Sequence, residues 1–161
     1  MELNNSKAGI HFRKVNKDDL RLLFDWANDD EVRNNSLSTN KISIEEHTKW
    51  FNKRIDSVNA QFYILEYNSI PAGLVKFEYD DSELAWIIGY SVSKDFRNLG
   101  LGRKLLSNGI NSLGKLPVIG YVKPDNIKSL KIFEALGFRN DGLQTVKGAT
   151  VIRFTKFFNP E

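Results

Sequence analysis

The sequence feature that most limits the possible folds is a glycine-containing turn between an extended run and a helical run. Residues 86–92 read Trp-Ile-Ile-Gly-Tyr-Ser-Val, an apolar stretch rich in β-branched and aromatic side chains, as in a strand. Gly100 and Gly102 follow a short polar stretch, and a helical spacing of leucines begins directly after them. The order of strand, tight loop and helix N-terminus predicts a protein that contains both strands and helices.

The same loop predicts an anion site. Gly100 and Gly102 allow positive φ and close approach of the backbone to a ligand, and the first N–H groups of the following helix have no partner inside the helix. The helix dipole favours a negative charge at this end, and Arg97 and Arg103 add full positive charges. We therefore expect a pyrophosphate here. The spacing fits neither the three-glycine dinucleotide fingerprint nor the P-loop, in which Lys104 would need different neighbours.

Length and composition predict one compact domain over residues 1–161, with residues 1–8 as a flexible leader. The chain is 41% hydrophobic and 12% aromatic, enough for a real core. It has no cysteine, which excludes disulfides, thiolate zinc sites and a cysteine nucleophile, and we expect no metal site. Without a signal-peptide pattern or a run of about 18 apolar residues, we expect a soluble cytoplasmic protein without a membrane partner.

The charge pattern argues against a nucleic-acid partner. The formal net charge is +3, and the 23 basic residues are spread along the chain instead of forming one patch. Nucleic-acid binders more often gather their basic side chains on one surface, interleaved with exposed aromatic residues. We expect a mixed, solvated surface on a monomer or a homodimer, still compatible with a polyphosphate ligand.

Hydrophobic periodicity and capping residues place the remaining elements. Asn16 predicts the start of a helix, Ser43 begins a capping-box spacing before a second helix, and Gly137 ends a later one. The polar residues 33–41 predict a mobile segment over a binding surface. The predicted strands are 10–15, 61–67, 72–79, 84–92, 118–122, 139–143 and 150–157, and the predicted helices are 17–27, 44–55, 101–113 and 126–136. The three strands from 61 to 92 form an antiparallel meander in an α+β, or mixed α/β sandwich, protein.

Two motifs carry a resemblance to a known family. The first is Val92-Ser-Lys-Asp-Phe-Arg-Asn-Leu-Gly-Leu-Gly102, and the second, about two dozen residues later, is Asn126-x-x-Ser129-x-x-x-Phe133-x-x-x-Gly-Phe138. In this order they resemble the GNAT superfamily of acyl-CoA-dependent N-acyltransferases. The resemblance implies a twisted, mostly antiparallel sheet with about four flanking helices, in which the strands at 84–92 and 118–122 run parallel and splay apart.

The resemblance also implies a reaction and a set of contacts. Acetyl-CoA is the implied co-substrate, and an amine attacks its thioester directly in a ternary complex, so the protein acts mainly by positioning both substrates. The backbone of Val92 would hold the pantetheine and thioester carbonyl. The residues implied at the pyrophosphate are Arg97, Asn98, Leu99, Gly100, Gly102 and Arg103. Asn126 would bond the pantetheine with help from Ser129, although Asn126 can equally be an ordinary helix cap.

The catalytic acid and base remain open. Where many GNAT enzymes have a tyrosine that protonates the leaving thiolate, this chain has Phe133. Tyr121 is a candidate replacement, with an ordinary strand tyrosine as the equal alternative. His47 has a suitable intrinsic pKa for a base, although a histidine on an apolar helix face is more often a packing residue. Glu78, near the meander turn, ranks below it.

The N-terminal half is similar to acetyltransferases that act on nucleotide-linked amino sugars, notably in pseudaminic and related nonulosonic acid synthesis. The similar residues are Trp26-Ala-Asn-Asp-Asp-Glu-Val-Arg33 and Ile42-Ser-x-Glu-Glu-His-x-x-Trp50-Phe51. The implied acceptor is the 4-amino group of a UDP-linked 4-amino-4,6-dideoxy sugar. Asn28, Arg33 and His47 would then contact the sugar or its diphosphate, and Trp50 would form a pocket wall or pack in the core.

Three functions therefore stand. The first is an N-acetyltransferase for a nucleotide amino sugar. The second is an N-acetyltransferase for a protein N-terminus or another small amine such as an antibiotic, which would share the co-substrate motif and differ in the acceptor cleft. The third is a non-catalytic acyl-CoA-binding module, suggested by Phe133.

Overall fold

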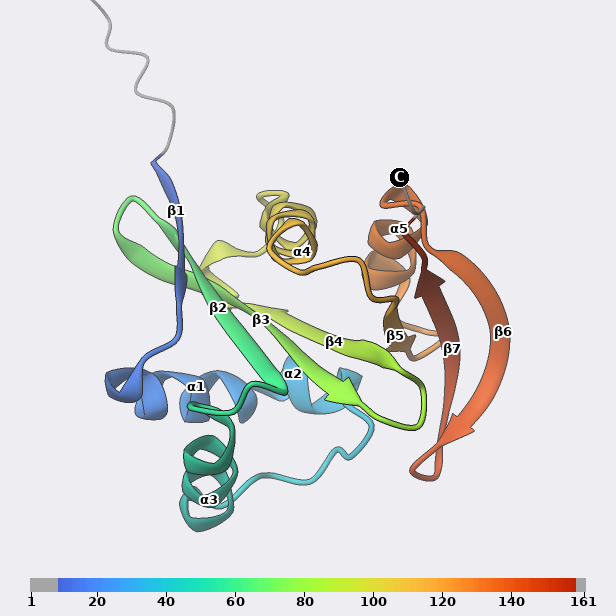
Figure 1. Ribbon diagram of the computed structural model, residues 1–161. Helices are drawn as coiled ribbons and strands as arrows, with labels where there is room; N and C mark the ends of the chain where they lie inside the picture. Colours follow the sequence, from blue (N-terminus) through green and yellow to red (C-terminus); the bar gives the residue numbers. More distant parts are fainter. Residues whose placement is uncertain (1–8, 159–161) are drawn as a thin grey trace, which may run out of the picture.

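The computed structural model describes residues 9–158, whose strands form a single seven-stranded sheet (Figure 1). The order across the sheet is β1-β2-β3-β4-β5-β7-β6. The strands are β1 Ile10–Lys14, β2 Ala60–Tyr67, β3 Ile70–Asp80, β4 Ala85–Val92, β5 Val118–Val122, β6 Arg139–Val146 and β7 Ala149–Lys156. The leader expected over residues 1–8 lies outside the described residues.

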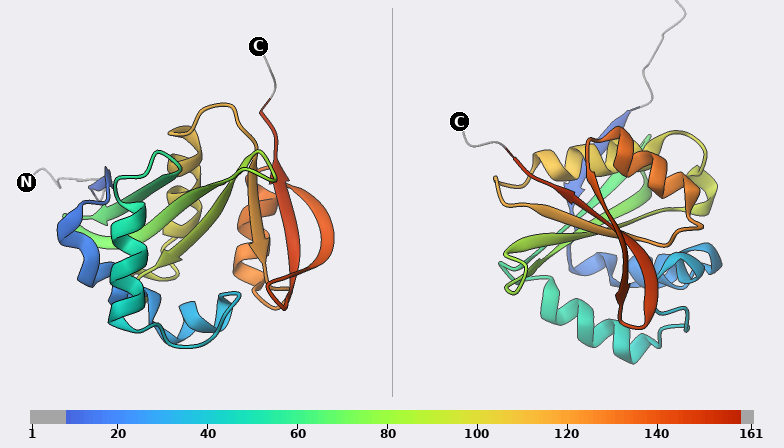
Figure 2. Two further views of the ribbon diagram at one scale, coloured as in Figure 1. Left: turned by 60° about the horizontal axis from the view of Figure 1, so that its bottom comes forward. Right: turned by 90° about the vertical axis from the view of Figure 1, so that its right-hand side faces the viewer.

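Helices cover both faces of this sheet (Figures 1 and 2). The helices α1 Leu20–Ala27, α2 Asp30–Asn35 and α3 Ile44–Arg54 lie on one side, called here the α1–α3 face. The helices α4 Leu101–Asn111 and α5 Ile127–Ala135 lie on the other side, the α4–α5 face. Two short 3₁₀ turns, Lys17–Asp19 and Lys94–Phe96, precede α1 and the α4 loop.

The alternation of side chains along β3 divides the core into two clusters. Val75 and Phe77 are buried in the larger cluster with Leu105 and Leu106 of α4. Leu74 is buried in the smaller cluster with apolar side chains of α1, α3 and β2. Because successive strand residues point to opposite faces, Lys76 and Glu78 share the α1–α3 face with Leu74.

The parallel pairing of β4 with β5 is short. It joins Trp86 to Val118, Ile87 to Ile119 and Ile88 to Gly120, and it is the one parallel pair among the described strands. From Gly89 onward β4 pairs only with β3, while Tyr121 and Val122 of β5 pair only with β7. We call the opening between these unpaired edges the split. Free backbone groups therefore face it from both strands.

Most of the predicted elements are confirmed, as is the α+β class with its mostly antiparallel sheet. Asn16 and Ser43 cap their helices through their side chains, and Gly137 has a φ of +80° after α5. One expectation is wrong: residues 33–41 are not irregular throughout, because α2 covers Asp30–Asn35. Asp29 accepts hydrogen bonds from the amides of Glu31 and Val32 and so caps α2, but a helix of six residues with one apolar side chain shows no hydrophobic periodicity. The chain thus has five α-helices in its described part instead of about four.

Candidate functional site

The glycine loop, residues 97–102, presents an uncapped helix N-terminus to open space. Gly100 is the N-cap residue of α4, with a φ of +74° and no side-chain cap. A Cβ built on Gly100 would meet no atom within 4 Å. Asn98 also has a positive φ, of 64°. The first amides of α4 therefore lack a capping partner from Gly100 and lie beside room for a ligand.

Gly102 allows α4 to begin close to its neighbours. A Cβ at this position would lie 3.1 Å from Cδ1 of Ile132 on α5 and 3.4 Å from Cε2 of Tyr90 on β4. Lys128 of α5 donates a hydrogen bond of 3.0 Å to Oδ1 of Asn98. The glycine loop, the start of α5 and the end of β4 therefore meet in one place.

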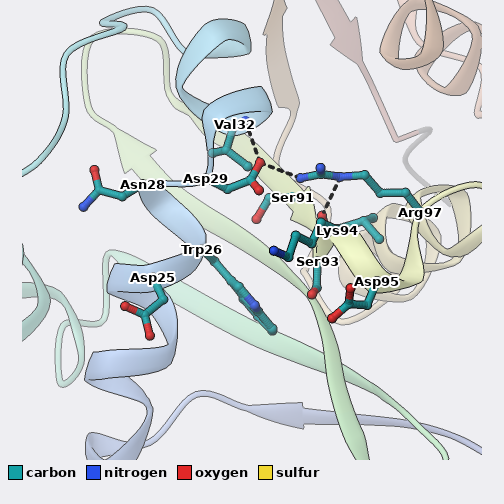
Figure 3. A pocket seen from close by; sticks show the side chains of 11 residues that line it. Asp25, Trp26, Asn28, Asp29, Val32, Ser91, Ser93, Lys94, Asp95 and Arg97 are labelled. Carbon is teal, nitrogen blue, oxygen red and sulfur yellow. Dashed lines mark hydrogen bonds and ion pairs between the residues drawn. The ribbon is translucent and has the colours of Figure 1, made fainter.

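Arg97 does not extend into the open space beside the glycine loop. Its guanidinium makes ion pairs of 2.7 Å with both Asp29 and Glu31 at the start of α2, and its Nε donates to the carbonyl of Val92 at 3.2 Å. Figure 3 shows Arg97 and Asp29 reaching toward one another across the pocket. Arg103 and Leu99 are exposed, and within residues 9–158 Arg103 has no ion-pair partner. Arg103, in the first turn of α4, is thus free to meet an anion beside this loop.

The pocket in Figure 3 has a volume of about 320 Å³ and lies between α1, α2 and the end of β4. Trp26, Asp29 and Val32 line one side, and Ser91 and Lys94 line the other. Partial burial alone raises the pKa of the Asp29 carboxyl, but hydrogen bonds from Arg97 and from the α2 amides bring it below its usual range. Asp29 is therefore ionised at neutral pH and ties α2 to the glycine loop.

The α4–α5 face of the split is formed by the beginning of α5. Asn126 caps this helix, accepting from the amide of Ser129 at 3.4 Å. Ser129 is buried, and its hydroxyl is hydrogen bonded to the hydroxyl of Tyr90. Phe133 is buried, and its ring packs directly on Gly120. A Cβ at Gly120 would lie only 2.3 Å from Cε1 of Phe133. Asn126 and Ser129 thus lie together beside the split.

On the α1–α3 face, two of the expected acceptor-binding residues bond to the backbone instead. Asn28 exchanges two hydrogen bonds, of 2.9 and 2.8 Å, with the carbonyl and amide of Ile42. Arg33 donates to the carbonyls of Ala27, Ser38 and Asn40 and to the hydroxyl of Ser36, at 2.7 to 3.1 Å. Both side chains hold the connection between α2 and α3 in place. Arg33 forms no ion pair with a carboxylate of residues 9–158, so no direct partner there neutralises its positive charge.

His47 is buried in the smaller core cluster region. Its Nε2 lies 2.9 Å from the carbonyl of Leu20, and its ring contacts Phe24, Trp50 and Phe51. Burial is the main reason that its pKa lies below the usual value, so the imidazole is neutral and Nε2 carries the donated proton. These contacts are those of a packing residue, with only 3% of His47 exposed.

Lys76 is the residue on this face that sequence reasoning missed. The aliphatic chain of Lys76 crosses Gly89, the first β4 residue beyond the parallel pair. A Cβ at Gly89 would lie 3.0 Å from Cε of Lys76. Its ammonium lies 5.1 Å from the ring centroid of Trp50. Within residues 9–158 it forms no ion pair or hydrogen bond, although Lys76 is half-buried. The face of the sheet on which Lys76 lies follows from period-two alternation in β3, a signal available in the sequence, but its place at the split does not.

Other charges surround Lys76. Loss of water lowers its pKa most, Glu78 opposes this, and Arg33, Lys147 and Arg54 lower it further. Glu78 is itself paired with Arg54 at 3.5 Å. The positive charges around Lys76 thus outnumber the negative ones. Trp50 is half-buried and stacks on Phe62, so it is at once a core residue and a wall beside Lys76.

Tyr121 lies on the opposite face of β5 from Gly120 and Phe133. Burial raises its pKa most, Arg153 lowers it, and Glu83 and Asp80 raise it slightly. Arg153 is held by Glu83 through two hydrogen bonds of 3.0 and 2.9 Å. Tyr121 therefore adjoins the α1–α3 side of the split, half-buried, apart from Ser129 and Asn126.

Neither a metal site nor a membrane span is found in the part of the chain that the structure describes. No three or more His, Asp or Glu side chains there are grouped as ligands for a metal ion. No helix between residues 9 and 158 has the length and apolar character needed to cross a membrane.

Comparison with known proteins identifies a family model and several similar structures. The model described as "Acetyltransferase (GNAT) domain" matches residues 10–139. The spermidine N-acetyltransferase from Vibrio cholerae, solved with CoA and spermine, superimposes with a TM-score of 0.80 at 18% identity, covering 92% of this chain and 95% of that one. A GNAT acetyltransferase from Streptococcus pneumoniae gives 0.74 at 20% identity, covering 94% and 100%. Among curated protein sequences, none matches this chain.

Proposed function

We propose that this chain, which belongs to the GNAT acetyltransferase family, transfers the acetyl group of acetyl-CoA to a primary amine. The observation that carries this proposal is the position of an uncapped, open helix N-terminus at Gly100 directly beside the split. A pyrophosphate at the loop and an extended arm along the unpaired edge of β4 account for both features together.

The residues at this place fit acetyl-CoA. The amides at Gly100 and Gly102, with Arg103, would hold the pyrophosphate, and Asn98 and Leu99 would border it. The unpaired edge of β4 near Val92, together with Asn126 and Ser129, would hold the pantetheine. Acetyl-CoA supplies an acetyl group activated as a thioester. Arg97 would reach the pyrophosphate only by leaving Asp29 and Glu31, so in the present arrangement it positions the loop.

The amine enters from the α1–α3 face, where Lys76, Trp50 and Tyr121 adjoin the split. An amine must be neutral to attack a carbonyl, and its proton has to pass to a base or to water. Glu78 lies on this open face, whereas His47 is buried and bonded to Leu20. Of these two candidates for the base, we therefore now favour Glu78, which reverses the order that the sequence suggested.

The acceptor that we propose carries negative charge beside its amine. Within residues 9–158 Lys76 forms no ion pair, and the charges of Arg33, Arg54 and Lys147 around it outnumber that of Glu78. A phosphate or carboxylate would relieve this local excess of positive charge, and a polycation would increase it. A UDP-linked 4-amino-4,6-dideoxy sugar, the acceptor implied by the similarity of the N-terminal half, has this character. Spermine, with which the Vibrio cholerae enzyme was crystallised, does not.

A second candidate acceptor is a cationic small amine. The pocket of Figure 3 contains the carboxylates of Asp25, Asp29 and Asp95, which would attract such an amine. Asp29 forms an ion pair with Arg97, and Asp25 forms one with Arg21 at 3.2 Å. The net negative charge of the pocket is therefore smaller than its three carboxylates suggest. The three carboxylates of this pocket still support polyamines, N-terminal peptides and antibiotic amines as the alternative acceptors. A non-catalytic acyl-CoA-binding module is the third function.

The experiment that tests the proposal measures free-thiol release from acetyl-CoA with a panel of acceptors. The panel contains UDP-4-amino-4,6-dideoxy sugars, the same sugars without the nucleotide, spermidine, aminoglycosides and N-terminal peptides. We expect release with the nucleotide sugars and much less with the uncharged sugars. Release only with spermidine or peptides would move the same chemistry to the alternative acceptor. Binding of acetyl-CoA without release across the panel would favour the binding module.

The assembly and the cellular location of the protein complete the proposal. We propose a cytoplasmic monomer or homodimer, in keeping with the absence of cysteine from the sequence. One of the similar Vibrio cholerae structures is described as dodecameric. Sedimentation velocity of the purified chain would separate these assemblies by mass.

A further inference from the structure

We propose that the hydroxyl of Tyr90, paired with Ser129, gives its proton to the thiolate that leaves when acetyl-CoA is cleaved. This inference rests on the proposed function and assigns a role to a residue outside the two sequence motifs. Tyr90 lies on β4 two residues beyond Ile88, where the parallel pair with β5 ends. Its ring is next to Gly102, and its hydroxyl bonds to Ser129 of α5. The phenol thus spans the space between the glycine loop and the split.

The other side chains on this side of the split cannot supply a proton. Phe133, one helical turn beyond Ser129, packs its ring against Gly120 and has no acidic hydrogen. Asn126 is an amide, and it is engaged as the cap of α5. Among the described residues beside the α4–α5 side of the split, the Tyr90 and Ser129 hydroxyls are therefore the pair that can act as an acid.

The surroundings of Tyr90 suit this role. Its side chain is half-buried and packs against the larger core cluster, with the ring centroids of Tyr90 and Phe133 6.4 Å apart. Burial raises the pKa of Tyr90 more than the bond to Ser129 lowers it, so the phenol is protonated at neutral pH. A half-buried acid that stays protonated is available to a thiolate formed beside it.

The step balances without any further reactant. The amine nitrogen forms a bond to the acetyl carbon, the carbon–sulfur bond breaks, and its electron pair stays on sulfur. Tyr90 gives the phenol proton to this sulfur, and the phenolate is protonated again through the Ser129 hydroxyl from solvent. The proton that the amine loses passes to the base or to solvent, so the products are the amide and coenzyme A with a free thiol.

The first test compares Tyr90→Phe with Tyr79→Phe. Tyr90→Phe keeps the ring between Gly102 and Phe133 and removes only the hydroxyl. We expect kcat to fall by about ten-fold or more, with an unchanged KM for acetyl-CoA and loss of the basic limb of the pH profile. Tyr79, a half-buried tyrosine that packs on Trp86, is the matched control and should change neither quantity. A full kcat in Tyr90→Phe, or the loss appearing in Tyr121→Phe instead, would overturn the inference.

The second test does not depend on turnover. It measures by calorimetry the Kd of CoA and of desulfo-CoA, which lacks the sulfur atom. A hydroxyl that meets the sulfur should make the wild type prefer CoA by several-fold, and Tyr90→Phe should abolish the preference. Equal binding of both compounds by the wild type contradicts contact with the sulfur. Failure of all acceptors together with an intact preference would instead count against the proposed function alone.

A purely structural role for Tyr90 predicts a different pattern. If the bond to Ser129 served only to tie β4 to α5, Ser129→Ala and Tyr90→Phe would lower the thermal midpoint equally and leave the CoA preference unchanged. We expect Ser129→Ala to keep part of the preference, because the phenol remains in place.

Discussion

The two faces of the sheet at the split differ in how the chain builds them. On the α4–α5 face, the glycine loop and the start of α5 come from two short motifs, and the fold brings these two segments together. On the α1–α3 face, the residues beside the split come from three separate segments around Trp50, Lys76 and Tyr121, and the charge of Lys147 from a fourth segment acts on Lys76. The expected acceptor contacts Asn28 and Arg33 are bonded mainly to backbone. A site built from contiguous residues is therefore easier to recognise than one assembled by the fold.

The largest expected effect tests the α4–α5 face. Gly100→Glu places a carboxylate and a Cβ at a residue with positive φ beside the proposed pyrophosphate. Like-charge repulsion of several kcal/mol should weaken acetyl-CoA binding by at least about 100-fold. Isothermal titration calorimetry measures the Kd.

The matched control for this change is Gly142→Glu. Gly142 has a φ of +87° and equally open surroundings, but it lies in β6. It should show a similar backbone strain, of about 1 kcal/mol, without weaker binding. Undiminished acetyl-CoA affinity in Gly100→Glu would remove the pyrophosphate from this loop.

The next effect separates packing from catalysis on the α1–α3 face. His47→Ala removes a buried ring with three aromatic neighbours and a bond to Leu20, and should lower the free energy of unfolding by roughly 2 to 4 kcal/mol. The kcat per folded molecule should be nearly unchanged. Denaturant unfolding and steady-state kinetics on the same preparation measure both. Normal stability with a large loss of kcat would restore His47 as the base.

His47 also predicts a pH dependence of stability. Its pKa in the folded protein lies below its value of about 6.5 in the unfolded chain, so the unfolded state binds more protons. The wild type should therefore lose stability as the pH falls below about 6.5, with no further loss below the folded pKa. His47→Gln should lack this part of the loss. The measurement is the thermal midpoint of the wild type and of His47→Gln between neutral pH and pH values under 6. A parallel decline in the two proteins would show that His47 makes no contribution.

A smaller effect tests the charge of the α1–α3 face. Lys76→Glu reverses the charge that lies nearest Gly89 and Trp50. We expect the kcat/KM for an acidic acceptor to fall by about ten-fold, which corresponds to 1.4 kcal/mol, and that for spermidine to rise. Lys49→Glu, an exposed change on α3, serves as the control for net charge. Equal effects of both changes would show that long-range charge, and not a contact of Lys76, determines the preference.

The smallest effect concerns the connection between the two faces. Asp29→Asn keeps a good helix cap for α2 but removes one of the two carboxylates that hold Arg97. With Arg97 freer to meet the pyrophosphate, acetyl-CoA should bind about two- to five-fold more tightly, a range typical of partly exposed ion pairs. Glu31→Gln should act in the same direction. Weaker binding in both variants would mean that Arg97 contributes more by holding the loop in shape than by its charge.

The sequence by itself determined the α+β class, most element boundaries and the glycine loop between β4 and α4. Periodicity and capping residues depend on neighbours a few positions away, so the cap at Ser43, the limits of β5 and the positive φ of Gly100 follow from local physics. Sequence analysis missed the short helix α2 because five polar residues and a single valine carry no hydrophobic period, and its cap competes with a turn at the same Asp29.

Only the tertiary structure decided which side chains face the split and which are already bonded. Asn28, Arg33 and His47 are typical substrate-binding or catalytic residue types, and their partners Ile42, Ala27 and Leu20 became visible only after folding. Lys76 and Tyr90 are ordinary strand residues in the sequence, and they reach the split because β4 loses its pairing with β5 after Ile88. The place where a parallel pair ends depends on packing between distant segments, so local patterns do not specify it.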